Sequence, residues 1–368
     1  MKVLILGDAS NPHIIKWANG LQSADITVVL FSLVDYDSKS FKEGIEVYNS
    51  KGFGKVLRLK EGAITKIKYL TTVPQIRSII KKTKPDILHS HYASSYGILG
   101  ALTGFHPFIV SVWGGDVISF PKYSPFHKAL LKFTLKKANR ILSTSNFMAK
   151  LLSDYTKKSI EITPFGVDTA VFKPDEKLRL FSDRTDLVIG TIKSLEWYYG
   201  IEYMIQAFHI ITKRLPDLKL KLLIVGGGAL EKKIKNLVHE LNLDDRALFT
   251  GKISYKEIHK YYNALDIYVA VSVYEESFGV AVLEASATEK PVIISRVGGM
   301  IEVVDENVTG FIVPPRNAEE TAEKLIELIM NEDLRHKMGK AGRKLVVEKF
   351  SFDKCLSNMI NIYINILN

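Results

Sequence analysis

Two glutamates stand eight residues apart where an apolar run gives way to an apolar helical pattern. Glu276 lies in a polar loop after a run that ends near Val271, and Glu284 lies in the pattern that follows Gly279. The uncapped N–H groups at the start of such a helix, here near Phe278, form a site for an anion. A glycine beside them lets a ligand approach the backbone closely.

The surroundings of the two carboxylates predict different roles for them. Glu276 precedes the helix, whereas Glu284 lies about one and a half turns inside it among apolar residues. A carboxylate in that stretch needs a polar partner, because burying a charge unpaired is costly. We expect one glutamate near a reacting group and the other on a diol such as ribose. Two glutamates at this spacing are also common on ordinary helices, which is the competing interpretation.

Length and composition limit what can surround these residues. The 368 residues suffice for two domains of ordinary size, and 46% hydrophobic with 24% charged residues is typical of globular chains. Cys355 is the single cysteine, which excludes disulfide scaffolds and cysteine-rich zinc sites. The apolar start is interrupted by Asp8 and is too short for a signal peptide, and no run approaches a membrane span.

Short β-rich runs alternate with amphipathic helical patterns along the chain, which predicts βαβ units and parallel sheets. The predicted strands are 2–6, 27–31, 55–59, 87–91, 108–112, 140–143 and 160–163, then 187–191, 219–225, 247–250, 267–271 and 292–295, with a hairpin-like piece near 311–314. The predicted helices include 14–22, 74–82, 146–154, 201–214, 230–241, 255–264, 280–288 and 318–331. In such folds ligands bind at the carboxyl ends of the strands.

The alternation stops at a polar stretch and then restarts, which predicts two Rossmann-like domains in series. We expect a first domain at 1–172, a linker at 173–186, a second domain at 187–350 and a C-terminal helix within 351–368. In that last segment Cys355, Met359, Ile362 and Ile366 recur at helical spacing. The helix could therefore cross back and pack on the first domain.

The excess positive charge lies entirely in the first half. Residues 1–172 hold 23 Lys and Arg against 12 Asp and Glu, whereas residues 173–368 hold 27 against 28. Lys128, Lys132 and Lys136 share one helix face and Leu131 and Leu135 another, as in helices that rest on anionic membranes. A solvated outer face of a packed helix is the alternative. Nucleic acid is disfavoured, because no stacking-aromatic pattern or recognition-helix motif accompanies the lysines.

The segment Glu276-Ser277-Phe278-Gly279 with Glu284 resembles the E-x7-E signature of glycosyltransferase family 4, retaining enzymes of the GT-B fold. Other segments resemble this family's motifs in the same order: 163–168 with Phe172 and Pro174, 225–228 with Glu231, 291–299 with Glu302, and 310–313. The resemblance implies two Rossmann-like domains facing across a cleft. It also implies transfer of a hexose-type sugar from a nucleotide diphosphate sugar, among which a UDP-sugar is the first candidate. The acceptor would be a glycan, a lipid-linked molecule or a phosphate-bearing molecule, and the pathway cell-surface polysaccharide or glycolipid synthesis.

The resemblance also implies roles for residues of the second domain. Glu284 would accept the ribose hydroxyls, Glu276 would contact the donor sugar, and Lys193 would supply a cation for the leaving diphosphate. The remaining donor-binding candidates are Ser277, Phe278, Gly279, Val280, Gly226, Gly228 and Lys252. Tyr198 stands where the family has a second lysine, a departure that would remove one charge contact; Lys252 or Arg296 could substitute.

In the first domain the resemblance points to residues that would meet the acceptor and the sugar. Asp116, in the loop 111–116, would contact the donor sugar's hydroxyls, although Trp113 replaces the family's usual histidine. His13 and His91 match a subgroup's motifs, and together with Asn11 they are the acceptor-site candidates. Each histidine could equally be a strand-end residue bonded to backbone.

We expect neither a metal nor another cofactor. Asp35-Tyr36-Asp37 mimics a D-x-D metal motif, but it follows a strand of the first domain, and we interpret it as a solvated loop. The expected partners are the nucleotide sugar, the acceptor and an anionic membrane surface. The expected location is the cytoplasm, with peripheral attachment to the inner face of the cytoplasmic membrane.

Three other functions compete with this one, and the first of them is weak. A dehydrogenase would need G-x-G-x-x-G after a strand, which neither Gly7 nor the turn 226–228 provides. A sugar-nucleotide epimerase of the same fold would release an altered sugar without an acceptor. A degenerate, non-enzymatic partner subunit is supported only by the departures at Tyr198 and Trp113.

Overall fold

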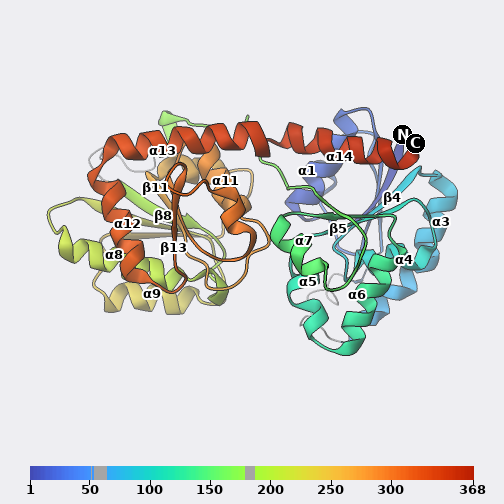
Figure 1. Ribbon diagram of the computed structural model, residues 1–368, viewed down its shortest axis with the longest axis horizontal. Helices are drawn as coiled ribbons and strands as arrows, with labels where there is room; N and C mark the ends of the chain where they lie inside the picture. Colours follow the sequence, from blue (N-terminus) through green and yellow to red (C-terminus); the bar gives the residue numbers. More distant parts are fainter. Residues whose placement is uncertain (51, 54–63, 179–186) are drawn as a thin grey trace. The chain divides into compact units, whose positions relative to one another are not determined.

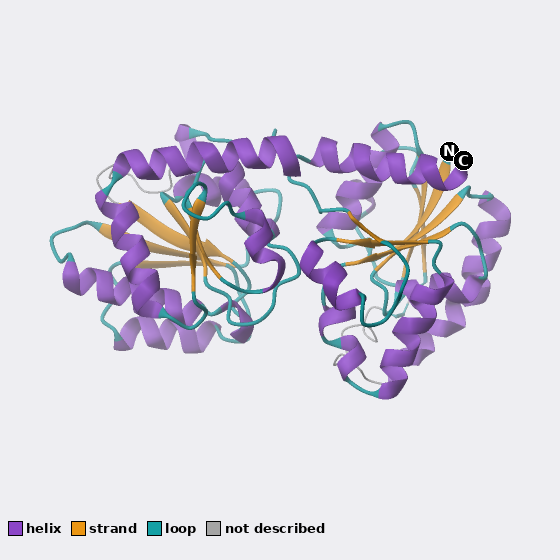
Figure 2. Ribbon diagram, in the orientation of Figure 1, coloured by secondary structure: helices purple, strands orange, loops and turns teal. Residues whose placement is uncertain are grey.

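A computed structural model describes residues 1–50, 52–53, 64–178 and 187–368 of the protein. The described strands form two separate parallel sheets, and helices lie on both sides of each sheet (Figure 2). The chain divides into two units, each with its own hydrophobic core (Figure 1). Unit 1 comprises Met1–Phe165 and Cys355–Asn368, and unit 2 comprises Gly166–Lys354.

Unit 1 contains a seven-stranded sheet in the order β3-β2-β1-β4-β5-β6-β7. Its strands are β1 (Lys2–Leu6), β2 (Thr27–Ser32), β3 (Glu46–Asn49), β4 (Ile87–His91), β5 (Phe108–Val112), β6 (Arg140–Ser143) and β7 (Ile160–Ile162). Its α-helices are α1 (Pro12–Ser23), α3 (Val73–Thr83), α4 (Tyr96–Thr103), α5 (Gly115–Ile118), α6 (Pro125–Lys137) and α7 (Asn146–Leu152), joined by most of α14 (Phe352–Leu367).

The described strands of this sheet match the expected ones except for β3 at its edge. β3 was not expected, because it is a half-exposed edge strand of only four residues, polar at both ends, and forms no clear apolar run. The strand expected at 55–59 lies outside the described residues. The other expected strands of this unit are present within one residue of their predicted ends.

Unit 2 contains a six-stranded sheet in the order β10-β9-β8-β11-β12-β13. Its strands are β8 (Leu187–Ile192), β9 (Leu220–Val225), β10 (Ala247–Gly251), β11 (Ile267–Ala270), β12 (Val292–Ser295) and β13 (Gly310–Val313). Its α-helices are α8 (Ile201–Arg214), α9 (Glu231–Glu240), α10 (Ile258–Ala264), α11 (Val280–Ala287), α12 (Ala318–Met330) and α13 (Glu332–Leu345).

The strand pairing predicted for the hairpin-like piece near 311–314 is wrong. β13 runs parallel to β12, so the two strands are joined by a crossover rather than a tight turn. The connection contains the 3-10 helix η6 (Gly298–Val303). This matters for the site, because it brings Gly298 and Gly299 back over the carboxyl ends of the strands.

The boundary between the units falls after Phe165 rather than at residue 172. Phe172 is buried, and its ring contacts Tyr255 and Tyr262 of unit 2. The predicted linker at 173–186 is described as far as residue 178 and belongs to unit 2 there; residues 179–186 lie outside the described part.

The C-terminal helix α14 completes unit 1. Cys355, Met359, Ile362 and Tyr363 are buried, and the Tyr363 hydroxyl lies 2.6 Å from Nδ1 of His89 in β4. Three of these four were anticipated from helical spacing. Within the described ranges, no helix is long and apolar enough to cross a membrane.

In each sheet the chain reverses its direction of strand addition at one place. β1 lies between β2 and β4, and β8 lies between β9 and β11. The loops after β1 and β4 therefore diverge in unit 1, as do those after β8 and β11 in unit 2. Such switch points leave a crevice at the carboxyl edge of the sheet, where ligands bind in this fold class.

Candidate functional site

Lys193 and Glu276 form an ion pair at the switch point of unit 2. Lys193 follows β8 and Glu276 lies in the loop after β11, so the two loops that diverge there carry opposite charges. Lys193 Nζ donates to Glu276 Oε1 and Oε2 at 2.9 and 2.8 Å. The two side chains are only 10% and 13% exposed. The Ser272 hydroxyl also donates to Glu276, which fixes that carboxylate further.

The environment keeps Lys193 charged. Burial acts to lower the pKa of the Lys193 ammonium, but the Glu276 carboxylate and its hydrogen bond outweigh burial and raise it. The ammonium also lies 4.5 Å from the centre of the Tyr199 ring. Burial and the nearby Glu276 charge raise the pKa of Tyr199 to about 12, so its ring faces the cation as a neutral phenol.

Two glycine turns hold the loops that carry this pair. A Cβ on Gly298 would lie 2.2 Å from the Glu276 carbonyl oxygen, and the Gly299 N–H donates to that oxygen at 2.8 Å. A Cβ on Gly226 would lie 1.9 Å from the Lys193 carbonyl oxygen. Both glycines also have positive φ, +52° and +138°. Gly226 packs closely against the Lys193 backbone and Gly228 against the Leu195 backbone. Both glycines therefore position the loop that carries Lys193.

Glu284 is buried on α11, and it has the polar partners that its apolar surroundings require. Tyr255 donates to its Oε1 at 2.9 Å and Tyr262 to its Oε2 at 2.8 Å. Burial and the adjacent carboxylate raise the pKa of both tyrosines, which keeps their hydroxyls available as donors.

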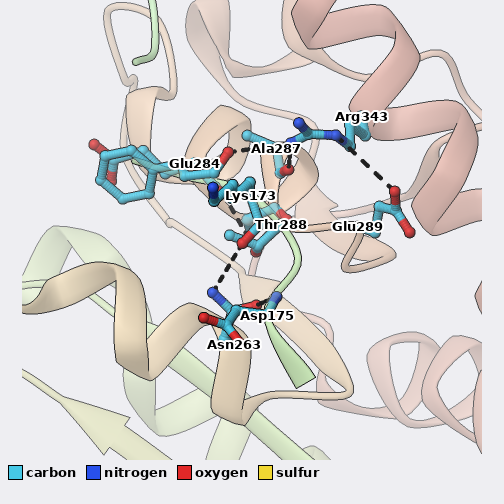
Figure 3. Close-up of polar contacts among 10 residues, drawn as sticks. Lys173, Asp175, Asn263, Glu284, Ala287, Thr288, Glu289 and Arg343 are labelled. Carbon is cyan, nitrogen blue, oxygen red and sulfur yellow. Dashed lines mark hydrogen bonds and ion pairs between the residues drawn. The ribbon is translucent and has the colours of Figure 1, made fainter. Parts of the chain in front are cut away.

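The far end of α11 is anchored by residues from distant parts of unit 2 (Figure 3). Arg343 of α13 donates to the Ala287 carbonyl, and its Nε lies 4.0 Å from the Glu289 carboxylate. Asn263 of α10 donates to the Lys173 carbonyl and accepts from the Asp175 N–H. These contacts fix the helix that carries Glu284 and the element that carries Tyr262.

The amino end of α11 faces the same edge of the sheet. Gly279, with φ +109°, is its N-cap, and no side chain caps the helix. Ser277 is half-buried, and the buried Phe278 ring packs 5.7 Å from that of Phe350, so only the Phe278 backbone can meet a ligand. Val280 begins the helix.

Lys252 and Arg296, the two residues expected to substitute for a second lysine, differ in their surroundings. Lys252 is exposed directly after β10, next to Gly251, whose carbonyl accepts from the Gly226 N–H. Arg296 is already ion-paired with Glu306 at 2.8 Å. Lys252 is therefore better placed than Arg296 to replace the missing second lysine.

Unit 1 has a pocket of about 340 Å³ at its own switch point. Its walls come from the loops after β1, β4 and β5, and include Asp8, Asn11, Ile14, His91, Tyr96 and Trp113. Two of the predicted acceptor residues, Asn11 and His91, thus line one pocket. Asn11 is also the N-cap of α1, because its Oδ1 accepts from the His13 N–H at 2.8 Å.

The histidines of this pocket region are neutral and incompletely bonded. Burial lowers the pKa of His91 to about 3, and burial with the Lys16 charge lowers that of His13 to about 3. Both ring nitrogens of His91, and Nδ1 of His13, are buried without a hydrogen-bond partner among the described residues. His13 stacks on Phe165 at 4.2 Å and meets the Trp113 edge at 6.0 Å. Neither histidine is satisfied by backbone at these atoms.

Asp116 differs from its expected position. It has no exposed surface, and its carboxylate accepts from the N–H groups of Ala93, Trp113 and Gly114 at 2.7, 3.2 and 2.8 Å. Burial raises the pKa of Asp116 to about 6, although these hydrogen bonds act to lower it. Asp116 ties the loops after β4 and β5 together behind the pocket, and this geometry does not support contact with a sugar.

Sequence reasoning missed several residues of both sites. Tyr255, Tyr262 and Ser272 bond the two glutamates, and Asp8 lines the pocket of unit 1. Asp8 follows β1 directly, so its place after the first strand at a switch point was a usable signal. The tyrosines gave none, because their contacts depend on how α10 packs against α11.

Two family models match the chain. Residues 172–345 match the model described as "Glycosyl transferases group 1", and residues 2–145 match "Glycosyl transferase 4-like". An uncharacterized glycosyltransferase of Methanocaldococcus jannaschii is 28% identical over 339 residues, covering 90% of this chain and 89% of that protein. The N-acetyl-alpha-D-glucosaminyl L-malate synthase of Bacillus anthracis is 27% identical and covers 81% and 79%.

Solved structures agree on the fold. Sucrose-phosphate synthase from Thermosynechococcus elongatus superposes with a TM-score of 0.81 at 21% identity, covering 99% of this chain and 98% of that one. Anabaena HepE in complex with UDP gives a TM-score of 0.82 at 17% identity over 99% and 100%. The resemblance found in the motifs and the twin parallel sheets lead to the same assignment: each half of the chain matches a glycosyltransferase family model, and the chain is a glycosyltransferase of the GT-B fold.

Proposed function

We propose that this glycosyltransferase moves a hexose-type sugar, with retention of configuration, from a nucleotide diphosphate sugar held by unit 2 to an acceptor held by unit 1. The observation that carries the proposal is the ion pair of Lys193 with Glu276 at the switch point. Glu284, which accepts from two tyrosines, lies on α11, the helix that follows the Glu276 loop. HepE was solved with UDP and with UDP-glucose, which supports UDP-sugars as the first donors to test.

Glu284 suits the ribose of the donor. Each of its two oxygens accepts a phenol hydroxyl, so the carboxylate is held in one orientation as an acceptor of hydroxyls, the groups that a ribose diol presents. The tyrosines fix the carboxylate plane before the nucleotide arrives. Glu276, held by Lys193 and Ser272, would accept hydroxyls of the donor sugar.

Positive groups at the same edge suit the leaving diphosphate. As the bond from C1 to the phosphate oxygen breaks, negative charge collects on the diphosphate and positive charge on the sugar ring. The amino end of α11 at Gly279 and Val280, with Lys252, would stabilise the diphosphate, so we propose that no metal is needed. The departing phosphate oxygen would take the acceptor proton while the acceptor oxygen bonds C1 on the same face.

The acceptor would enter the pocket of unit 1, against Asn11 and His91, with His13 next to the lining residue Trp113. Relatives named for their acceptors include a D-inositol 3-phosphate glycosyltransferase of Pseudarthrobacter chlorophenolicus, 27% identical over 91% of this chain. A GDP-mannose-dependent phosphatidylinositol monomannoside mannosyltransferase of Mycobacterium tuberculosis is 30% identical over 53% of this chain. These two names support an acceptor with a cyclic polyol, free or within a glycolipid.

Thermal unfolding with UDP-, GDP- and ADP-sugars tests the donor site. A ligand at about 100 times its dissociation constant should add about 2.7 kcal/mol to the free energy of unfolding. Glu284→Ala should abolish that gain, and Glu240→Ala, on the exposed face of α9, should keep it. The proposal fails if no nucleotide sugar stabilises the chain or if the gain survives Glu284→Ala.

We further propose that unit 1 rests on anionic membranes through α6. Lys128, Lys132 and Lys136 are exposed, whereas Leu131 and Leu135 are buried in the core. At the start of the helix Tyr123 and Phe126 are 45% and 54% exposed. Cationic side chains beside exposed aromatic ones suit a negatively charged lipid interface.

Vesicles containing phosphatidylserine test this surface. The chain should sediment with them, and salt should weaken the binding. Replacing the three α6 lysines by Gln should reduce it, at roughly 1 kcal/mol per lysine. The matched control replaces Lys232, Lys233 and Lys235 of α9 in the same way. Equal binding by both variants would refute the proposal.

A further inference from the structure

The pocket of unit 1 contains polar groups whose hydrogen-bonding needs can be matched to a ligand class. His91 is 3% exposed, and neither ring nitrogen has a partner among the described residues. Because burial lowers its pKa to about 3, the ring is neutral, with one nitrogen that donates and one that accepts. Leaving such groups unpaired in a protein interior is unfavourable, so His91 is suited to a ligand that both donates and accepts.

Asp8 adds a second requirement. Its carboxylate lines the pocket, and Oδ1 accepts from the backbone N–H and the hydroxyl of Ser10 at 2.8 and 2.7 Å. The carboxylate only accepts, so it favours a ligand with hydroxyl donors. A phosphate or carboxylate in the same place would be repelled.

The rest of the wall carries no compensating charge. None of the described residues that line the pocket is Lys or Arg. Trp113, Ile14 and Val34 give it an apolar side, and the Trp113 ring lies 5.0 Å from that of His91. A pocket that combines an aromatic ring beside a neutral imidazole with a carboxylate suits a ligand ring with hydroxyls at its edge and C–H groups on its face.

We infer that this pocket binds an uncharged, hydroxyl-rich ring, a sugar or a cyclic polyol, and that Asp8 and His91 select it. The inference rests on the proposed function and narrows it: among glycan, lipid-linked and phosphate-bearing acceptors, the part inside the pocket carries no charge. Any phosphate or lipid of the acceptor lies outside it.

Acceptor competition with matched pairs tests the inference. Methyl glucoside, methyl mannoside and myo-inositol are each compared with a phosphate ester of the same ring, using the donor found by thermal unfolding. We expect at least one uncharged ring to be glycosylated, with KM roughly tenfold or more below that of its phosphate. Asp8→Asn should narrow this difference.

The variants separate binding from folding. His91→Phe keeps the ring size and should raise the acceptor KM roughly 5- to 50-fold, as expected for one or two lost hydrogen bonds, with the donor KM unchanged. His91→Gln, which restores a donor and an acceptor, should recover part of the loss. His239→Phe and Asp154→Asn change the same residue types at exposed positions and should leave both KM values unaltered.

Each result decides one of the two proposals. If no nucleotide sugar binds, the proposed function fails. If the donor binds and is slowly hydrolysed, but no uncharged ring is accepted or phosphate esters are preferred, only the inference about the pocket is overturned. The same holds if His91→Phe and Asp8→Asn leave the acceptor KM within twofold.

Discussion

Lys193 and Glu276 form an ion pair where the loops after β8 and β11 of unit 2 diverge. Both side chains are nearly buried, and the Glu276 carboxylate holds the pKa of the Lys193 ammonium above its ordinary value although burial acts to lower it. Removing one partner of such a pair leaves an uncompensated charge, which is more damaging than the net stability of the intact pair suggests. Lys193 therefore holds the Glu276 carboxylate in position, in addition to any contact that it makes with a ligand.

Replacing Lys193 by Met should therefore affect both stability and activity. We expect the free energy of unfolding to fall by about 3–5 kcal/mol, as for other broken buried pairs. With the orientation of Glu276 lost, kcat should fall by roughly a hundredfold. Urea unfolding and steady-state kinetics measure the two effects.

A matched control is Lys260→Met, which breaks an exposed pair with Glu257 at 3.2 Å. Exposed pairs contribute about 0–1 kcal/mol, so this variant should unfold and react as the parent does. Equal effects of the two substitutions would contradict the role given to Lys193.

Asp116 predicts a pH dependence. Its folded-state pKa, about 6, lies above its ordinary value of 3.8, so the folded chain binds this proton more tightly than the unfolded chain. Stability from this group is thus present at low pH and is lost as the pH rises from about 4 to about 6. Relative to Asp116→Asn, the parent should lose at most about 3 kcal/mol over that range. Urea unfolding of both proteins at pH 4, 5, 6 and 7 measures it, and a difference that does not change with pH would contradict it.

At the scale of elements, glycines determine how closely the loops over the sheet of unit 2 can approach. The turn at Gly298 touches the Glu276 backbone, and the turn at Gly226 touches that of Lys193. A side chain at either place would push a charged loop away from its partner. The glycines thus act on the ion pair through the backbone.

Gly298→Ala should be strongly destabilising and should lower activity. Its φ of +52° is unfavourable for alanine, and the new Cβ would lie 2.2 Å from the Glu276 oxygen. Gly104→Ala is the control, because Gly104 has φ +76° but no atom within 4 Å of the added Cβ. We expect about 1–2 kcal/mol for the control from backbone strain alone and clearly more for Gly298→Ala. Thermal unfolding distinguishes them, and equal losses would show that the contact has no effect.

At the scale of the whole molecule, the last residues of the chain complete the first unit. The segment from Cys355 onward belongs to unit 1, and its Tyr363 hydroxyl bonds His89, whose ring lies 4.1 Å from the ring of His91. The end of the sequence therefore supports the pocket formed by its beginning. Stability of unit 1 should depend on this helix.

Met359→Ala should lower the free energy of unfolding by about 2–5 kcal/mol, because Met359 is buried at 2% exposure. Ile364→Ala, at a position 46% exposed on the same helix, should change it by less than about 0.5 kcal/mol. Hydrogen exchange should show faster exchange in residues 1–165 for Met359→Ala. Faster exchange confined to unit 2 would contradict the assignment of the helix.

Features that depend on a local pattern of residues could be predicted from the sequence. Short continuous apolar runs identified nearly all described strands, because parallel strands are buried on both faces. Order and spacing of the glycine and glutamate motifs identified the family. The need of Glu284 for a partner also followed from its neighbours alone.

Only the tertiary structure decided which groups meet across long sequence separations. It paired Lys193 with Glu276 and gave Glu284 its tyrosines. It also placed Asp116 behind the pocket rather than in it. Propensity and periodicity act over a few residues, whereas these contacts depend on strand order and helix packing, which bring distant segments together. For that reason residue types and motifs could be read from the chain, but the partners of each charge could not.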